Sequence, residues 1–282
     1  MSKIINGQVL AKNIKDNIVQ EITKLGNARP NLAIILVGER PDSALYVKLK
    51  EEEAKKIGID TYLYKCEENI SEQELLKIIK YLNEDKIIDA ILVQLPLPDN
   101  LDTNAIIKTI NQIKDVDGFH PDNLEKLLKN CDANKLIPPV HAVVLEILKS
   151  IDCKIKDKQV CIISNSDIFG QTLSYILKCQ GANVEAIKSD NKNLTEKTSQ
   201  ADILITAVGK PKFIKKEIIK QGAVIIDIGI SYKDKKVFGD VDFEDVKDKV
   251  NYITPVPGGV GPMTIAMAFK NTLEIYKKRH EK

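Results

Sequence analysis

The stretch Leu32-Ala-Ile-Ile-Leu-Val37 decides the class of fold, because it is an uninterrupted run of apolar residues about as long as one strand. Strands of this kind are buried on both faces, which is typical of a parallel sheet covered by helices. An amphipathic segment at about 42–57 follows and predicts a helix. The pair predicts the first strand-and-helix unit of an α/β fold.

The same alternation continues along the first half of the chain. Apolar runs at 60–64 and 87–93 predict strands, and helical patterns occur at 72–82 and from 103 onward. A polar, turn-rich stretch at 114–137 then breaks the rhythm, before an apolar helix expected at 140–148. We therefore place a domain junction there, with a first domain at 1–139 and a second at 140–272.

The second half repeats the pattern and predicts a Rossmann-like sheet. Its expected strands are 159–163, 183–187, 202–206 and 223–228, and a helix is expected at 170–179. The chain ends with a proline- and glycine-rich loop and a helix, of which we expect 273–282 to pack back on the first domain. The expected fold is thus α/β, with two domains.

Composition narrows the classes of function. The chain has 282 residues, of which 43% are hydrophobic and 29% charged, as in an ordinary globular protein. Its 42 basic and 40 acidic side chains leave a formal net charge of +2. Without a strongly basic surface, we expect neither nucleic acid nor a membrane as a partner.

The cysteines and the first residues bear on metal binding and location. Five cysteines stand far apart with no C-x-x-C pair, so we expect no metal site. The first ten residues lack the apolar region of a secretory signal, and the longest uncharged apolar runs have the length of one strand. We expect a cytoplasmic protein.

Tyr46 and Lys50 are the first pair of residues that could carry chemistry. They lie four residues apart on an expected helix, so both side chains leave the same face. Alone, the pair fits a surface tyrosine beside a solvated lysine better than an active site. Gln94 follows an expected strand in Val93-Gln-Leu-Pro-Leu-Pro98, where an amide either binds a ligand, contacts a lysine or caps the strand.

Asp115-Val-Asp-Gly-Phe-His120 places two carboxylates beside a glycine. Such a segment can make a turn, orient a base or bind a cation, and turns are the commonest of these. A calcium loop needs more oxygen ligands at alternate positions than this segment supplies. We therefore discard a metal site here.

Thr254-Pro-Val-Pro-Gly-Gly-Val-Gly-Pro-Met-Thr264 is the strongest single signal in the chain. Glycines allow a ligand to approach the backbone, and the helix that follows offers N–H groups to oxygen atoms of a ligand. The expected dinucleotide turn, Ser164-Asn-Ser-Asp-Ile-Phe-Gly170, lacks the usual G-x-G-x-x-G pattern, so on motif grounds alone a dinucleotide is weakly supported. Later strand ends carry Gly209 and Gly229, where a nucleotide could pass close to the backbone.

Taken together, these motifs resemble the bifunctional methylenetetrahydrofolate dehydrogenase/cyclohydrolase family. The segments that carry the resemblance, in the family order, are Tyr46-x-x-x-Lys50, Val93-Gln-Leu-Pro-Leu-Pro98, Asp115-Val-Asp-Gly-Phe119, Gly239-Asp-Val241, Pro255-Val-Pro-Gly-Gly-Val-Gly-Pro-Met-Thr264 and Asn271-Thr272. They extend over essentially the whole chain. The resemblance implies a cleft between the two domains, folate binding mainly by the first domain, NADP or NAD binding by the second, and a homodimer.

The resemblance also implies the reaction and the roles of four residues. The family oxidises 5,10-methylenetetrahydrofolate with NAD(P) and hydrolyses the methenyl product to 10-formyltetrahydrofolate. Lys50 would be the general acid/base, Tyr46 would stack on the pterin and aminobenzoate region, Gln94 would tune the lysine and Asp115 would anchor the pterin ring. Hydride transfer needs alignment above all, whereas hydrolysis needs a base that is active near neutral pH.

Two sets of binding residues follow from the same resemblance. The folate set is Tyr46, Val93, Gln94, Leu95, Asp115, Pro257, Gly258, Gly259, Val260 and Gly261. The dinucleotide set is Ser164, Asn165, Ser166, Ser189, Gly209 and Ile230.

Two segments depart from the family pattern. The usual P-C-T-P-x-G is Pro138-Pro-Val-His-Ala-Val143 here, and we assign its His141 no catalytic role. The usual G-R-S is Ser164-Asn-Ser166, so the arginine that would clamp the 2′-phosphate of NADP is absent. No other arginine lies between positions 41 and 278, which leaves Lys188, serine hydroxyls and backbone to bind that phosphate. We therefore expect less discrimination between NAD and NADP than in a relative with the arginine.

Two other functions fit part of the sequence. The altered turn at 164–166 favours a cyclohydrolase whose dehydrogenase step is lost or weakened, although the retained glycines count against it. A non-catalytic folate- or nucleotide-binding module is the second alternative. Lys50 argues against that module, because binding alone gives this lysine no obvious purpose.

Overall fold

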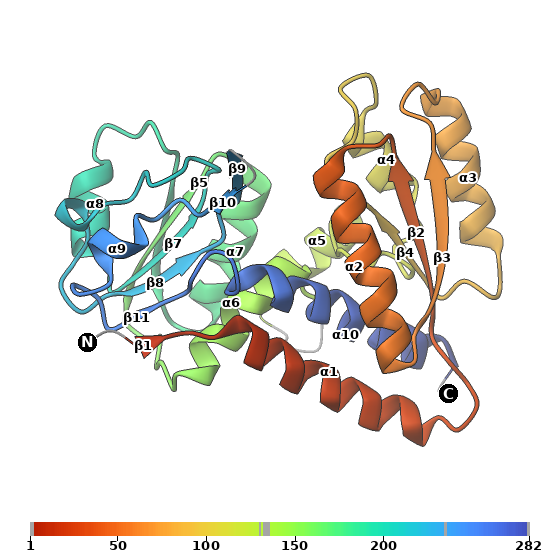
Figure 1. The fold of residues 1–282 in the computed structure, drawn as a ribbon, viewed down its shortest axis with the longest axis horizontal. Coiled ribbons are helices and arrows are strands. Elements are labelled where there is room, and N and C mark those ends of the chain that lie inside the picture. The colour runs from red at the N-terminus through yellow and green to blue at the C-terminus, as the bar shows by residue number, and fades with distance from the viewer. Residues whose placement is uncertain (1–2, 130, 132–135, 234–235, 281–282) are drawn as a thin grey trace. The chain divides into compact units, whose positions relative to one another are not determined.

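The computed structural model describes residues 3–129, 131, 136–233 and 236–280, and its two compact units are drawn in Figure 1. Unit 1 comprises residues 1–11 and 140–264, and unit 2 comprises 12–139 and 265–282. Each unit has its own parallel sheet with helices around it. The expected α/β class with two domains is confirmed.

Unit 2 is built on a three-stranded parallel sheet with the strand order β3-β2-β4. The strands are β2 (Asn31–Val37), β3 (Asp60–Cys66) and β4 (Ala90–Val93). The central strand β2 is buried from Leu32 onward, as its apolar sequence predicts. Strands β3 and β4 lie on opposite sides of β2. The connections to them therefore leave the sheet in opposite directions, and the carboxyl end of β2 is the point where the strand order switches. Ligands of open α/β sheets bind at such switch points.

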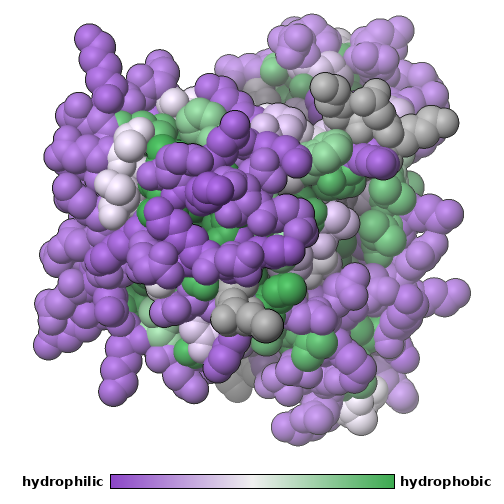
Figure 2. Space-filling model, turned by 60° about the vertical axis from the view of Figure 1, so that its left-hand side comes forward, coloured by the Kyte–Doolittle hydropathy of each residue, from purple (hydrophilic) through white to green (hydrophobic). Residues whose placement is uncertain are grey.

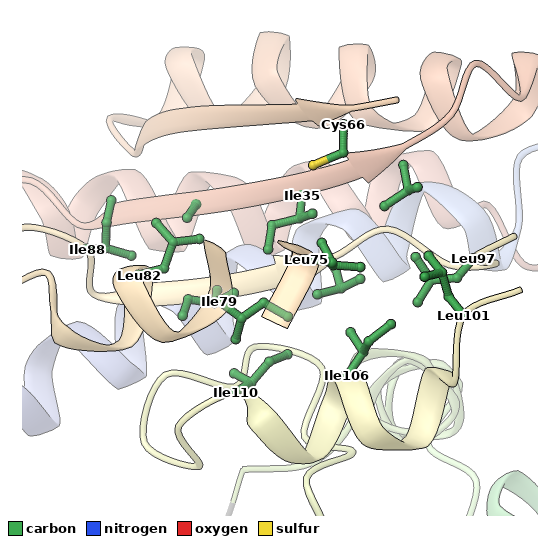
Figure 3. Close-up of a cluster of buried hydrophobic side chains, with 14 residues drawn as sticks. Ile35, Cys66, Leu75, Ile79, Leu82, Ile88, Leu97, Leu101, Ile106 and Ile110 are labelled. Carbon is green, nitrogen blue, oxygen red and sulfur yellow. The ribbon is translucent and has the colours of Figure 1, made fainter. Parts of the chain in front are cut away.

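The helices of unit 2 that lie wholly within it are α2 (Pro41–Ile57), α3 (Glu72–Glu84), α4 (Thr103–Thr109) and α5 (Pro121–Lys129). Helix α3 begins at a capping box, in which Ser71 accepts from the backbone of Glu74 and the Glu74 side chain accepts from the backbone of Ser71. Side chains of α3 and α4, among them Ile79 and Ile106, pack with Ile35 of the sheet in the buried cluster of Figure 3. This core holds in place the strands whose carboxyl ends carry the candidate site.

Unit 1 is built on a six-stranded parallel sheet with the order β1-β11-β8-β7-β5-β6. Its strands are β1 (Lys3–Ile4), β5 (Gln159–Ser164), β6 (Asn183–Ile187), β7 (Ile203–Ala207), β8 (Val224–Asp227) and β11 (Tyr252–Ile253). Strand β5 lies between β6 and β7, so its carboxyl end is the switch point of this sheet. Ser164 at that end lies opposite Ala207.

The other elements of unit 1 surround this sheet. They are α6 (Pro139–Ser150), α7 (Asp167–Cys179), α8 (Leu194–Gln200), α9 (Phe243–Val246), the short 3-10 helix η1 (Lys216–Ile218) and the antiparallel pair β9 (Ser231–Lys233) and β10 (Lys236–Phe238). Ser166 caps the start of helix α7, and its hydroxyl accepts from the Phe169 amide at 3.3 Å. This cap holds the turn between β5 and α7 in place.

The first and the last residues of the chain are assigned to the two units differently from the domain boundaries expected from sequence. Strand β1 pairs with β11, so the first eleven residues belong to unit 1. Helix α1 (Gly7–Lys24) therefore begins in unit 1 and continues in unit 2. Helix α10 (Val260–His280) passes into unit 2 after residue 264, whereas the sequence pattern suggested 272. A strand of two residues is too short for its pattern to be recognised.

Hydrophilic side chains cover most of the face shown in Figure 2, in keeping with the lysine-rich composition. Within the described residues, no helix is both long enough and apolar enough to cross a membrane.

Candidate active site

Lys50 of α2 and Gln94, the residue after β4, meet at the carboxyl end of the unit 2 sheet. The Lys50 Nζ donates a hydrogen bond of 2.7 Å to Gln94 Oε1. The Gln94 Nε2 donates to the Leu95 carbonyl at 2.7 Å, which turns the amide oxygen toward the lysine. The backbone of Gln94 is held in turn by the Ile35 carbonyl at 2.9 Å. The sheet itself therefore positions the acceptor of the lysine.

The surroundings of Lys50 favour proton transfer. Burial lowers the pKa of Lys50 below its ordinary value of 10.5, and the negative charge of Asp117 opposes this change. A lysine with a lowered pKa is a better base near neutral pH than a solvated one. Tyr46 is half-buried on the same helix face, one turn earlier. Lys50 is therefore not the solvated surface lysine that the Tyr46–Lys50 spacing, taken alone, favoured.

Asp117 is a functional candidate that the sequence analysis missed. Ile91 of β4 forms a parallel bridge with Asp115, which brings the following residues alongside the carboxyl end of β4. Asp117 lines a small cavity there with Val93 and Leu95. Burial raises the pKa of Asp117 to about 6, while the charge of Lys50 acts to lower it. The sequence signal for Asp117 is its spacing of two residues from Asp115, because alternate residues of an extended segment lie on the same face.

Asp115 has a different environment from Asp117. Its Oδ1 accepts from the Gly118 amide at 3.0 Å, and its Oδ2 accepts from the His120 amide at 2.8 Å. The same Oδ2 also accepts from Asn123 Nδ2 at 3.0 Å. Asp115 is buried, and three protein donors already occupy its oxygens. It therefore organises the loop that presents Asp117, and the expected contact with the pterin ring fits Asp117 better.

The loop from Pro257 to Gly261 lies in unit 1, apart from the unit that holds Lys50. Gly258 has φ +100 and open space beside its α-carbon, and Val260 begins helix α10. Gly259 packs so tightly that a β-carbon would lie 2.5 Å from the Pro255 carbonyl oxygen. The glycines are thus required by the loop itself, and its contact with folate stays a prediction.

The turn after β5 in unit 1 uses two of its expected ligand groups internally. The Ser164 hydroxyl accepts from the Ser166 amide at 3.1 Å, and Ser166 caps helix α7. Asn165 between them is exposed, and its Oδ1 accepts from the Ser189 amide at 3.3 Å. Of these three residues, Asn165 is therefore the one whose side chain extends from the turn toward the end of β6.

Ser189 and Gly209 of the expected dinucleotide set are linked to their surroundings by hydrogen bonds from two further residues. Lys210 Nζ donates to the Ser189 hydroxyl at 2.7 Å, and the Ser231 hydroxyl donates to the Gly209 carbonyl at 2.9 Å. Gly209 has φ +69 and open space beside its α-carbon, and Ile230 is 38% exposed. Hydroxyl, amide and ammonium groups around an open glycine at the switch point fit a dinucleotide.

A buried carboxylate, that of Asp240, accepts hydrogen bonds from the backbone of the loop after β7. Asp240 Oδ2 accepts from the Val208 amide and Asp240 Oδ1 from the Lys210 amide, both at 2.8 Å. A β-carbon on Gly229 would lie 2.1 Å from the Asp240 carboxylate, so only glycine fits at this point. Burial and the charge of Asp240 raise the pKa of the neighbouring Asp227 to about 7, against backbone hydrogen bonds that act to lower it. These contacts fix the backbone of residues 208–210.

His141 lies in unit 1 and is fully buried. Its Nε2 is 3.1 Å from the Phe169 carbonyl oxygen, so this nitrogen carries the proton. Burial lowers the pKa of His141 to about 4, which keeps the ring neutral near pH 7. This environment is that of a packing residue. Among the described residues, no group of three or more His, Cys, Asp or Glu side chains is arranged to hold a metal ion.

Fold and site together define a two-domain α/β enzyme, with a half-buried lysine at the switch point of one sheet and a dinucleotide fold in the other unit. Residues 5–117 match the catalytic domain and residues 138–280 the NAD(P)-binding domain of the tetrahydrofolate dehydrogenase/cyclohydrolase family. The chain belongs to this family.

Individual relatives match over the full length. The bifunctional protein FolD of a Sulfurihydrogenibium strain is 45% identical and covers 98% of both chains. The crystal structure of the bifunctional enzyme FolD from Campylobacter jejuni is 38% identical, with a TM-score of 0.94 over 99% of this chain and 100% of that one. The Trypanosoma brucei enzyme, complexed with NADP cofactor and inhibitor, is 32% identical, with a TM-score of 0.95 over 100% and 99%. The expectation of dehydrogenase/cyclohydrolase activity with NADP or NAD is confirmed.

Proposed function

We propose that Lys50 is the general acid/base of the hydrolytic step and that Gln94 keeps it in place. The chain oxidises 5,10-methylenetetrahydrofolate with NAD(P) and hydrolyses 5,10-methenyltetrahydrofolate to the 10-formyl product. In the hydrolysis, a water oxygen bonds to the methenyl carbon and Lys50 accepts a proton from that water. The bond from this carbon to N5 then breaks, N5 takes up the proton from Lys50, and the hydroxyl on the carbon releases its remaining proton to solvent as the carbon becomes the formyl group on N10. The observation that carries the proposal is the 2.7 Å hydrogen bond between the half-buried lysine and Gln94.

Around this centre, Tyr46 stacks on the pterin and aminobenzoate region, and Val93 and Leu95 line the folate site. Asp117 accepts hydrogen bonds from the pterin ring, a role that the position of this residue beside Lys50 supports. The folate proposal also includes Pro257, Gly258, Gly259, Val260 and Gly261, which the resemblance implies as a second group of contacts.

Hydride transfer takes place at the nicotinamide of the bound cofactor, which supplies the redox chemistry of the first step. The chain's own contribution is to hold that cofactor through Asn165, Ser189, Gly209 and Ile230, and through the turn at 164–166. No proton transfer by Lys50 is needed in this step. The two activities should therefore respond differently to the loss of the lysine.

The proposal also includes that the chain forms a homodimer and acts in the cytoplasm. Sedimentation equilibrium measures the oligomeric state and so tests the dimer.

The decisive variant is Lys50→Met, which keeps the length of the side chain and removes the ammonium. We expect methenyl hydrolysis to fall at least a thousandfold, within the range that general acid–base catalysis supplies, while part of the hydride transfer survives. Lys48→Met is the matched control, because Lys48 lies on the same helix with its side chain 73% exposed. Unchanged hydrolysis in Lys50→Met would remove the lysine from its proposed role.

A fluorescence titration with NADPH and NADH addresses the dehydrogenase half. Saturable binding of either nucleotide supports the bifunctional enzyme. If neither binds, the turn at 164–166 has lost its function and the chain is a cyclohydrolase alone.

A further inference from the structure

We propose that Lys210 is the residue that recognises the 2′-phosphate of NADP in this chain. The inference rests on the proposed dinucleotide site and deepens it, because it names the residue that separates NADP from NAD. In dinucleotide-binding folds, the adenosine ribose lies at the carboxyl end of the strand after the first turn, where an arginine often accommodates the 2′-phosphate. That strand is β6 here, and the position of the usual arginine is Asn165.

The first observation is the position of the Lys210 ammonium. Lys210 belongs to the loop after β7, yet its Nζ donates to the hydroxyl of Ser189, two residues past the end of β6, at 2.7 Å. The Ser189 amide donates in turn to Asn165 Oδ1 at 3.3 Å. A positive charge, a hydroxyl and an amide therefore meet at the end of β6. These are the groups that bind a phosphate when no arginine is present.

The second observation is that Lys210 is positioned from both sides. Its backbone amide donates to the buried Asp240 at 2.8 Å. Its ammonium stands 5.3 Å from the centre of the Phe213 ring, which favours a cation at that position. The side chain is exposed at its end, so a ligand can reach it.

The other lysines nearby are engaged with acidic side chains. Lys188 lies 3.3 Å from Asp167, and Lys212 lies 3.3 Å from Asp242. Their charges are thereby compensated, whereas the contact found for Lys210 is with a neutral hydroxyl. Asp190 follows Ser189 directly and is exposed. A carboxylate at this place accepts from the ribose 2′-hydroxyl of NAD, so Asp190 is the group that would favour NAD.

A lysine recognises phosphate as a point charge, without the two-pronged geometry of arginine. The preference for NADP should therefore be smaller than that of a relative with the arginine, and it should weaken with salt because the site is exposed. This agrees with the reduced discrimination expected from the sequence.

Isothermal titration calorimetry with adenosine 2′,5′-bisphosphate and with 5′-AMP tests the proposal directly, without turnover. Both ligands occupy the adenosine end, and they differ by the 2′-phosphate. We expect the unmodified chain to bind the bisphosphate about tenfold more tightly than AMP at low salt, a ratio typical of one hydrogen bond to a charged group. Lys210→Met should reduce this ratio to about one while leaving AMP affinity unchanged.

Lys212→Met is the control in the same loop and should keep the ratio. Asp190→Asn should raise the affinity for the bisphosphate by severalfold, because it removes a negative charge beside the phosphate. An unchanged ratio in Lys210→Met overturns the proposal, even where AMP binding shows that the dinucleotide site exists. Absence of binding of either ligand to the unmodified chain overturns the dinucleotide site and this proposal together.

Discussion

Lys50 and Lys210 have the same side chain, and their surroundings give them different chemistry. Lys50 is half-buried beside an amide oxygen, and the loss of solvation disfavours its charged form, so that it can exchange protons. Lys210 is exposed, with its ammonium beside a hydroxyl, where it can attract an anion. In a chain with 42 basic residues, residue type alone does not distinguish a proton-transfer lysine from a phosphate-binding one. The burial and the hydrogen-bond partners of each lysine distinguish the two roles.

The carboxylates of Asp115 and Asp117 should also separate by function. We expect Asp117→Asn to raise the KM for the folate substrate at least tenfold, because one acceptor oxygen and the negative charge are lost. We expect Asp115→Asn to lower the free energy of unfolding by roughly 1–3 kcal/mol instead, because one of its three donors loses its acceptor. Steady-state kinetics and urea unfolding of both variants measure the two effects.

The pH profile gives an independent test of Asp117. Because its pKa is raised to about 6, the carboxylate is protonated as the pH falls through 6 and loses an acceptor site for the pterin. The value of kcat/KM for folate should therefore fall on the acid side near pH 6, and this limb should disappear in Asp117→Asn. Persistence of the limb in that variant would assign it to another group.

At the level of single residues, sequence allowed part of the site to be predicted. Lys50 and Gln94 stand at positions that their strand and helix dictate, and the structure brings them into contact. The choice between Asp115 and Asp117 could not be made from sequence, because it depends on which carboxylate the loop's own amides occupy. The contact between Lys210 and Ser189 joins residues 21 positions apart in sequence, and no local pattern reveals it.

At the level of elements, the long apolar strands could be predicted and the short ones could not. Strand β6 was expected at the residues where it occurs, and β5 and β7 differ by one residue at their ends. The two-residue strands β1 and β11 have too few residues for a pattern, although their pairing decides which unit holds the first residues. Helix α5 lies within the stretch at 114–137 that the sequence analysis described as turn-rich, because nine residues give little periodicity. Residues 130 and 132–135 of that stretch lie outside the described residues.

Helix α10 is tied to unit 2 by a buried charge near its end. Asp89 is 1% exposed on its side chain, and Arg279 donates to it at 2.9 Å and to the Ile88 carbonyl at 2.7 Å. His280 also contacts Asp89, at 2.7 Å. The arginine thus compensates a carboxylate that would otherwise be costly to bury.

We expect Arg279→Met to lower the free energy of unfolding by about 2–4 kcal/mol, because the buried carboxylate loses a charged partner. Urea unfolding followed by circular dichroism measures this change. Lys278→Met, at the exposed neighbouring position, should change it by less than about 0.5 kcal/mol. Equal stability of the two variants would show that His280 and the backbone suffice to hold Asp89.

At the level of the whole molecule, the residues proposed for the two steps divide between the two units. Lys50, Gln94 and Asp117 belong to unit 2, whereas Asp240 and the dinucleotide residues belong to unit 1. Each unit has a separate core, with Leu75 and Ile79 in one and Leu204 and Ile225 in the other. A change confined to the dinucleotide residues of unit 1 should therefore impair the dehydrogenase step and spare the hydrolysis.

Asp240→Asn tests this division. An asparagine has one acceptor oxygen in place of two, so it cannot keep its bonds to both the Val208 and Lys210 amides, and the loop after β7 loses its fixed position. We expect the KM for NADP to rise about tenfold or more, consistent with one unsatisfied buried group, while methenyl hydrolysis assayed without cofactor stays within twofold of the unmodified chain. Circular dichroism must show that the variant is folded. A parallel loss of both activities in a folded Asp240→Asn would mean that the hydrolytic step depends on the loop after β7 as well, and the assignment of this loop to the dehydrogenase step alone would then be wrong.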